Sequence, residues 1–584
     1  MLRFDPIKFL GLLSAVVLLG ILPGQVWADT DKGPNQELAR PTPQHLAWHE
    51  MEIEMFLCLD PATWQNREYD NHSTPLSKIN PTRLDTDQWC RVAKSFGARQ
   101  IIFVAKHTGG FCWWQSETTD YSIKNAAWKD GKGDVLAELA DSCKKHGLKL
   151  GIYVYPGDDT WGAPMGSGGK TRDPSQQEAY NKVFRQQMTE VLSQYGPMSE
   201  VWFDGSCVIE VGNILKKYAP DAMIFQGPYA TIRWVGNERG IGPDPCWNAV
   251  KKTDAASGVA TSVHGDPNGN VWLPNEVDTT LLDHKWFWGE NTDHMFKSPE
   301  QLMDIYYKSV GRGCVLLLNA TPDTSGLIHE NHVQRYAEFG AEIKRRFGQC
   351  LTETKGAGNL ITLSLEKPTT INHTIIMEDV ARGQRVRQYT LEGLVGDQWR
   401  NLFQGTSIGY KKIDIFDSVT VSAVRLRVTE SIGPAQIKRF AVFNVKPKSP
   451  ALEIPAPTET AESTWQQVGA WDAQTIKTAW TTLDLNLSPF IPQAGQYEVQ
   501  FQKVDGPDNF EIKSAIAVLE GMETSGFAQP HPVKPDTYII NRTAVVSPDR
   551  KETTHLRMAI RFTGSGDGKI QALIRPLLPQ TPDN

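Results

Sequence analysis

Residues 101–155 contain the stretch that decides the fold. Ile101-Ile102-Phe103-Val104-Ala105 is a short continuous apolar run, which is typical of a parallel strand buried on both faces. The segment 133–146, GDVLAELADSCKKH, has the period of a helix and ends before Gly147, a residue that favours a helix C-terminus. The following segment 148–155, LKLGIYVY, indicates the next strand. A strand, a helix and a strand in this order predict a β–α–β unit.

The same alternation continues over about residues 45–348. It predicts further helices and strands, the helices over 176–195, 209–218 and 299–310 and the strands over 200–203, 222–226 and 314–318. Repeated β–α units of this kind favour a (β/α)8-type barrel. We therefore expect an α/β protein in which residues 29–349 form a TIM-like barrel.

Helical patterns stop after about residue 350. Residues 420–428, TVSAVRLRV, alternate apolar and polar side chains, and this pattern predicts a β-sandwich over 350–446. A linker rich in Pro, Ser, Thr and Ala follows at 447–463, and a second β-rich domain at 464–584. We expect the first sandwich to support the barrel. Attachment to carbohydrate or to a cell surface is one hypothesis for the second.

The N-terminus has the pattern of a signal peptide. Arg3 and Lys8 precede an apolar run at 9–22, and Ala28 suits cleavage before Asp29. The run is shorter than the roughly 20 apolar residues of a spanning helix, and no other segment is predicted to span a membrane. We expect residues 1–28 to be removed and the protein to be secreted or periplasmic; an uncleaved anchor is the alternative.

Charge and cysteine spacing exclude some classes of function. The net charge of −7 and the absence of a basic tract argue against nucleic acid as a partner. The eight cysteines contain no C-x2-C spacing, so no zinc site is expected. Several lie in apolar stretches, which favours buried free thiols over a dense disulfide framework. The 18 tryptophans suit stacking on sugar rings, although they also fill cores.

Polar residues follow several predicted strands. Lys106-His107, Tyr155, Asp204, and Asn319 with Asp323 all lie at or just after strand ends. Because the active site of such a barrel lies where strands end and loops begin, these side chains are expected on one rim.

Two carboxyl groups on such a rim suit glycoside hydrolysis with retention, which needs them about 5–5.5 Å apart. Asp204, at the end of a core strand in Val201-Trp202-Phe203-Asp204-Gly205, suits the nucleophile. The general acid is better placed beside aromatic side chains that partly desolvate it. Glu238, four residues after Trp234, and Glu276, ahead of Trp286, both qualify. The alternative for each is a surface or ion-paired carboxylate.

Several motifs resemble those of glycoside hydrolase family 29, the α-L-fucosidases, and most closely those of the α-1,3/4-fucosidase branch. The matching pieces, in order along the chain, are LAWHEME at 46–52, AKH at 105–107 with Gly110-Phe111, VWFDG at 201–205, RWVGNERG at 233–240, and LLLN at 316–319 with Pro322-Asp323. The segment 378–443 also resembles the β-sandwich that follows the barrel in this branch.

The resemblance implies a double-displacement fucosidase that acts on fucosylated oligosaccharides or polysaccharides without metal or cofactor. Asp204 matches the family nucleophile, and Glu238 matches the acid/base of the α-1,3/4 branch. Glu276 remains the alternative acid or a substrate-binding residue. The remaining residues expected to bind substrate are His107, Glu68, Tyr69, Tyr153, Tyr155, Trp202, Arg233, Trp114 and Trp286.

Because of two departures from the family pattern, the identity of the sugar is not predicted. The usual Phe-x-His-Phe reads Phe56-Leu57-Cys58-Leu59, and the usual Lys-His-His-Asp-Gly-Phe reads KHTGGF at 106–111, with Thr108 and Gly109 as replacements. A site that loses hydrogen-bonding groups discriminates differently among hydroxyls. A modified fucose such as an O-sulfate, an α-linked galactose-type sugar, and a non-catalytic glycan-binding protein are therefore alternatives.

Overall fold

The computed structural model describes residues 38–254, 264–292, 295–446, 465–490, 495–506, 509–519, 522–526, 529–530, 537–544, 555–563 and 568–577. The expected signal peptide at 1–28 and the expected linker at 447–463 lie outside the described residues. The chain divides into two compact units, residues 1–447 and 448–584.

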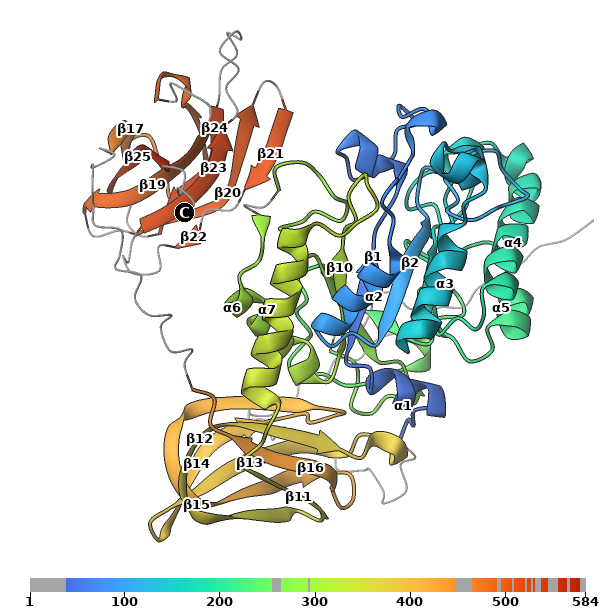
Figure 1. Ribbon diagram of the computed structural model, residues 1–584. Helices are drawn as coiled ribbons and strands as arrows, with labels where there is room; N and C mark the ends of the chain where they lie inside the picture. The colour runs from blue at the N-terminus through green and yellow to red at the C-terminus, as the bar shows by residue number, and fades with distance from the viewer. Residues whose placement is uncertain are drawn as a thin grey trace, which may run out of the picture. The chain divides into compact units, whose positions relative to one another are not determined.

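Eight parallel strands form the barrel of the first unit (Figure 1). In chain order they are β1 (Ile53–Leu57), β2 (Gln100–Lys106), β3 (Lys149–Val154), β4 (Glu200–Trp202), β5 (Met223–Phe225), β6 (Arg233–Trp234), β9 (Asn275–Thr279) and β10 (Val315–Ala320). Their order in the sheet is β5-β4-β3-β2-β1-β10-β9-β6. A parallel bridge between Phe225 and Ile232 joins the two ends of this sheet. The predicted TIM-like barrel is confirmed.

Seven α-helices accompany these strands among the described residues. They are α1 (Pro43–His49), α2 (Thr86–Ser95), α3 (Val135–His146), α4 (Gln177–Gln194), α5 (Gly212–Tyr218), α6 (Pro299–Lys308) and α7 (Glu330–Phe347). Local sequence explains the bounds of α3: Asp134 accepts a hydrogen bond from the Ala137 amide, and Gly147 ends the helix with φ +68°. The expected helix over 209–218 begins only at Gly212.

The connections on either side of β6 depart from a regular β–α repeat. No α-helix occurs among the described residues between β5 and β6 or between β6 and β9. The second connection instead contains the short strands β7 (Ala249–Val250) and β8 (Val271–Trp272), which pair with each other. This irregular part of the barrel carries Glu238.

The first β domain is one six-stranded antiparallel sheet in the order β11-β16-β12-β15-β13-β14. Its strands are β11 (Thr352–Ala357), β12 (Leu360–Glu378), β13 (Val386–Val395), β14 (Gln398–Gly405), β15 (Lys412–Ser431) and β16 (Gln436–Phe443). The long strands β12 and β15 change register at bulges, and residues of the sheet enclose their own apolar core. This antiparallel sheet with its own core agrees with the β-rich domain predicted from the alternating sequence.

Contacts of this domain with the barrel lie near the amino ends of the strands. Lys411 pairs with Glu52, the residue before β1, at 2.7 Å. Phe443 packs on Phe347 at the end of α7, with ring centroids 5.4 Å apart. These contacts place the domain at the amino ends of the barrel strands, opposite the loops that follow their carboxyl ends. From there it can support the barrel.

The second unit contains two antiparallel sheets. The five-stranded sheet has the order β17-β25-β19-β23-β22 and the four-stranded sheet the order β18-β24-β20-β21. Their strands are β17 (Gln466–Asp472), β18 (Thr481–Asn486), β19 (Gly495–Asp505), β20 (Phe510–Leu519), β21 (Met522–Gly526), β22 (Gln529–Pro530), β23 (Thr537–Ala544), β24 (His555–Phe562) and β25 (Lys569–Leu577). Side chains of both sheets share one apolar core, as in a sandwich.

The eight cysteines are free thiols, and seven of them are buried. This agrees with the expectation drawn from their apolar surroundings. Within the described part of the chain, no helix combines the length and apolar character needed to cross a membrane.

Candidate active site

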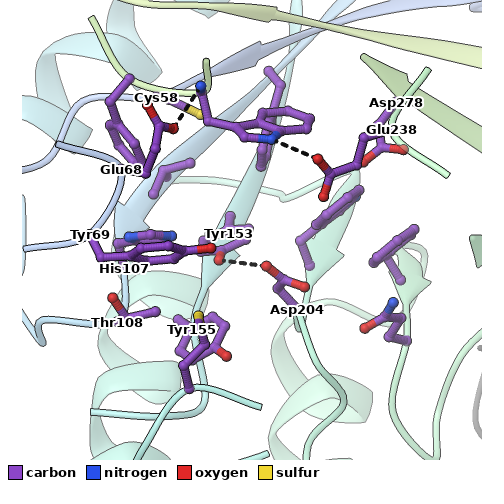
Figure 2. Close-up of a pocket in the computed structure, with 18 of the residues that line it drawn as sticks. Cys58, Glu68, Tyr69, His107, Thr108, Tyr153, Tyr155, Asp204, Glu238 and Asp278 are labelled. Atoms are coloured by element: carbon purple, nitrogen blue, oxygen red, sulfur yellow. Dashed lines mark hydrogen bonds between the residues drawn. The ribbon is translucent and has the colours of Figure 1, made fainter. Parts of the chain in front are cut away.

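A pocket that is open to solvent lies at the carboxyl ends of the barrel strands (Figure 2). Most strands contribute a residue at or after their end, as barrel geometry requires. The lining residues are Phe56, Cys58, Glu68, Tyr69, Val104, His107, Thr108, Tyr153, Tyr155, Met165, Trp202, Asp204, Phe225, Gln226, Trp234, Glu238, Asp278, Trp286 and Phe287.

Asp204 lies two residues beyond the end of β4. The Tyr153 hydroxyl donates a hydrogen bond to its Oδ2 at 3.1 Å, and the chain turns away at Gly205, whose φ is +68°. Burial raises the pKa of Asp204; the Tyr153 hydrogen bond lowers it, and the nearby Glu238 carboxylate raises it further. The side chain is therefore fixed in direction by a strand end and by a hydrogen bond.

Glu238 lies on the connection that follows β6. Glu238 is an exposed residue, and its carboxyl group accepts a hydrogen bond from the Trp286 indole at 3.1 Å. Gly236 and Gly240 bracket the turn with φ of +84° and +68°, and a side chain at Gly240 would lie 2.7 Å from Ile305. Figure 2 shows the carboxyl groups of Asp204 and Glu238 beside the same open space.

Asp278 is a pocket residue that we did not predict from the sequence. It lies on β9, accepts a hydrogen bond from the Trp234 indole at 2.8 Å, and is only 5% exposed. Burial raises its pKa to about 7; Trp234 opposes this shift, and Glu238 adds to it. Its signal in the sequence was its spacing of two residues from Glu276, because such residues share one face of a strand.

Aromatic side chains form much of the remaining lining. Trp202 and Phe225 stack in parallel with ring centroids 3.5 Å apart. His107 and Tyr69 also stack, at 5.8 Å and an interplanar angle of 9°. Burial lowers the pKa of His107 to about 4, so the ring is neutral at neutral pH. Such faces suit the apolar C–H surface of a sugar ring.

Glu68 and Trp286 are joined at the pocket wall. The Glu68 carboxylate accepts a hydrogen bond from the Trp286 amide at 2.8 Å, and Lys285 lies 3.4 Å from it. The Asn319 side chain, which does not line the pocket, donates to the Trp286 carbonyl at 2.9 Å. The backbone amide and the backbone carbonyl of Trp286 are thus both hydrogen-bonded. Its indole donates to Glu238.

Both replaced family positions line the pocket. Cys58 is buried, and Thr108 places a buried hydroxyl there that has no hydrogen-bond partner among the described residues. At Gly109 a Cβ atom would lie 2.3 Å from Asp70 Oδ2. The space for a side chain at position 109 is therefore taken by the carboxylate of Asp70, which accepts a hydrogen bond from Tyr121 at 2.6 Å.

Three residues expected to bind substrate lie elsewhere. Arg233 is 1% exposed and donates to the carbonyl oxygens of Leu273 and Trp247. Ile232, just before β6, and Trp234 on β6 pack in the barrel interior. The side chain of Arg233 between them therefore points outward. Trp114 is completely buried in the outer core and donates to Glu190 at 2.8 Å. Neither Arg233 nor Trp114 lines the pocket, so the structure does not support the expected contact of these two with substrate.

Glu276 is the third misplaced residue, and its hypothetical role as the acid is not supported. It points into the barrel below the pocket, where one of its carboxyl oxygens lies within 4.8 Å of one oxygen each of Glu54 and Glu200. Glu200 accepts hydrogen bonds from Trp48, Gln100 and Trp202 at 3.0 Å each. Burial and the charge of Glu200 raise the pKa of Glu54 and of Glu276. Burial also raises the pKa of Glu200, and the hydrogen bonds that it accepts oppose this shift.

Two further rim residues have structural roles. Lys106 is buried and pairs with Asp158 at 2.9 Å. Asp323 accepts hydrogen bonds from the backbone amides of Ser325 and Leu327 and so stabilises a turn. Of the rim residues expected from strand ends, His107, Tyr155 and Asp204 reach the pocket.

The buried carboxyl set predicts a pH-dependent stability. Glu54 has a folded-state pKa above its ordinary value of 4.5, so it stays protonated in the fold after the unfolded chain has lost its proton. The free energy of unfolding then falls as pH rises above 4.5, by ~1.4 kcal/mol per unit for each such proton. Glu54→Gln is expected to flatten the decline in Tm between pH 5 and pH 8. Glu366→Gln, at an exposed position, is the matched control; equal slopes for the two variants would contradict the assignment.

The Tyr153 hydrogen bond predicts a change in the pH profile of any activity that needs ionised Asp204. Because the bond lowers the pKa of Asp204, Tyr153→Phe is expected to move the acid limb of kcat/KM upward by about one pH unit. Tyr155→Phe is the control, since the Tyr155 hydroxyl accepts a hydrogen bond from the Gly166 amide, whereas the Tyr153 hydroxyl donates to Asp204. A downward shift, or the same shift in both variants, would contradict this role.

Comparisons with known proteins agree on one family. A family model described as alpha-L-fucosidase matches residues 46–346. The chain is 32% identical to "Alpha-L-fucosidase 1" of Arabidopsis thaliana over 437 residues, which are 66% of this chain and 83% of that protein.

Solved structures extend the likeness. One from Bacteroides thetaiotaomicron VPI-5482, which carries an α-L-fucosidase assignment, is 34% identical with a TM-score of 0.67, covering 70% of this chain and 100% of that one. A glycoside hydrolase 29 family member from an unknown rumen bacterium is 26% identical, also with a TM-score of 0.67. The second match covers 93% of this chain and 97% of that one, so it extends beyond the barrel into the later β domains.

Proposed function

Since the chain belongs to the α-L-fucosidase family of glycoside hydrolases, we propose that it releases terminal α-L-fucosyl groups with retention of configuration. The observation that carries this proposal is the presence of Asp204 and Glu238 in one pocket at the carboxyl ends of the strands. A pair of carboxyl groups is what the retaining mechanism requires.

In the proposed mechanism Asp204 attacks the anomeric carbon while Glu238 protonates the glycosidic oxygen. The leaving group departs, and Glu238 then takes a proton from the water that hydrolyses the fucosyl–Asp204 ester. Tyr153 supports the ionised form of Asp204 by donating to it. Trp286 supports Glu238 in the same way whenever that carboxyl group is ionised.

The sugar is proposed to bind through both polar and aromatic groups. His107 and Glu68 offer a neutral imidazole and a carboxylate to the ring hydroxyls, and Trp202 with Phe225 offers an apolar surface to the C6 methyl group. Cleavage of α-1,3 and α-1,4 linkages is proposed from the resemblance of the Glu238 loop to that branch of the family.

The charge of the lining disfavours a sulfated sugar. Its four acidic residues are Glu68, Asp204, Glu238 and Asp278, and no Lys or Arg lines it among the residues that the structure describes. An O-sulfate would meet carboxylates without a cation to pair with. The loss of two family imidazoles at Cys58 and Thr108 therefore makes the pocket more apolar and does not convert it into an anion site.

The experiment is hydrolysis of aryl glycosides and fucosylated trisaccharides, with the anomers followed by proton NMR. We expect turnover of an aryl α-L-fucoside, little turnover of an aryl α-galactoside, and α-L-fucose as the first product. Faster release from α-1,3- and α-1,4-linked than from α-1,2-linked trisaccharides would support the branch. β-L-Fucose as the first product would contradict retention, and binding of fucose without any turnover would favour a glycan-binding protein.

Export is proposed from the sequence pattern of residues 1–28 alone. N-terminal sequencing of the protein from the expressing cells is expected to begin at Asp29. A mature chain that retains the apolar run would favour the anchor.

A further inference from the structure

Exposed apolar side chains lie on the pocket wall and on the loop beside it. Among the described residues of the barrel, the large apolar side chains with high exposure are Tyr69, Met165 and Val208, at 50%, 57% and 63%. Tyr69 and Met165 line the pocket directly. A single exposed apolar residue needs no explanation, but a group of them around one cavity indicates a contact surface.

Two hydrogen bonds hold Met165 and Val208 beside the proposed nucleophile. The Gly166 amide donates to the Tyr155 hydroxyl at 2.7 Å, and the Val208 amide donates to the Gly168 carbonyl at 2.8 Å. A Cβ atom at Gly205 would lie 3.6 Å from the Gly166 Cα. The loop that carries Met165 is thus tied to the turn that follows Asp204.

Tyr69 is held separately, by the stack of its ring on His107. The polar groups that could read a fucose ring, such as Glu68 and the hydroxyl of Tyr153, are less exposed than these three side chains. The exposed edge of the pocket therefore carries apolar side chains, whereas Glu68 and Tyr153 lie deeper.

The order of these groups fixes which part of a substrate each one meets. In the proposed reaction the fucose ring lies over Asp204 in the interior, and Glu238 lies at the glycosidic oxygen. Whatever is attached to that oxygen extends toward the mouth. We propose that Met165 and Val208, with Tyr69, form the subsite for the leaving group, and that this subsite takes the C–H face of a pyranose ring. This inference rests on the proposed function.

The test compares a substrate that reaches this subsite with one that does not. α-L-Fucosyl fluoride has a leaving group of one atom, whereas an α-1,3-fucosylated trisaccharide places sugar rings at the mouth. For the double variant Met165→Ala/Val208→Ala we expect the ratio of kcat/KM for the trisaccharide to that for the fluoride to fall about tenfold, with most of the change in KM. Leu360→Ala, which removes an apolar side chain 51% exposed on β12, is expected to keep the ratio unchanged.

Each other outcome has a distinct meaning. An unchanged ratio in the double variant, or an equal loss on both substrates, would overturn the subsite and leave the proposed function in place. Met165→Leu is expected to keep most of the trisaccharide activity, because it retains apolar surface; a loss as large as that of Met165→Ala would also overturn the subsite. If the unmutated protein does not hydrolyse fucosyl fluoride, the proposed function itself is contradicted, and the subsite falls with it.

Discussion

Asp204→Ala is expected to lower kcat/KM for an aryl α-L-fucoside by a factor on the order of 10⁴ or more, because the variant lacks the group that forms the covalent intermediate. Thermal unfolding is expected to stay cooperative, since Asp204 lies beyond the end of β4 and is partly exposed. Asp304→Ala removes an exposed carboxylate on α6 that pairs with Lys308, and this control is expected to keep full activity.

Azide distinguishes a lost nucleophile from a damaged pocket. In Asp204→Ala a small anion can occupy the space of the carboxylate and attack the same carbon, and β-L-fucosyl azide is the expected product. Rescue without that product, or residual activity within tenfold of the unmutated protein, would show that Asp204 is not the nucleophile.

Glu238→Ala is expected to have the second largest effect, and the effect depends on the leaving group. A trisaccharide, whose leaving oxygen needs a proton, is expected to lose about 10²–10⁴-fold in kcat/KM. An aryl fucoside with an acidic phenol is expected to lose much less in the same parameter, because its leaving group departs without protonation. Added azide is expected to yield α-L-fucosyl azide, since it attacks the fucosyl–enzyme from the face that water uses.

Asp278 is the rival for this role, because it is buried in the same pocket and its pKa is raised to about 7. Asp278→Asn conserves the shape and the acceptor for the Trp234 indole. We expect it to lower activity on both substrates to a similar and smaller extent, as a residue that positions Trp234 would. If Asp278→Asn shows the leaving-group dependence and Glu238→Ala does not, the two assignments must be exchanged.

The barrel could be predicted because its signals are local. A buried strand such as 101–105 and a capped helix such as 133–146 are specified by nearby residues, and the β–α order then restricts the topology. The position of Asp204 follows from the same logic, since it comes directly after a core strand. The connections on either side of β6 have no comparable sequence pattern. The lack of α-helices among the residues described there could therefore not be predicted.

The direction of side chains was harder to predict than the position of the strands. Glu276 and Asp278 share one face of β9, yet they lie at different depths of the barrel. Only Asp278 reaches the pocket. Arg233 was misplaced because β6 is two residues long, too short for its alternation to be visible in the sequence. Asp70 fills the space beside Gly109 from a separate loop, a relation between distant residues that only the fold reveals.

The most direct measurement is the site of covalent labelling by 2-deoxy-2-fluoro-α-L-fucosyl fluoride. The fluorine slows both chemical steps, and the fluoride leaving group restores the first, so the intermediate accumulates and can be located by peptide mass spectrometry. The account predicts one fluorofucosyl group per chain, on Asp204. A label on Glu68, Glu238 or Asp278, or complete turnover of an α-L-fucoside with no labelled residue, would contradict it.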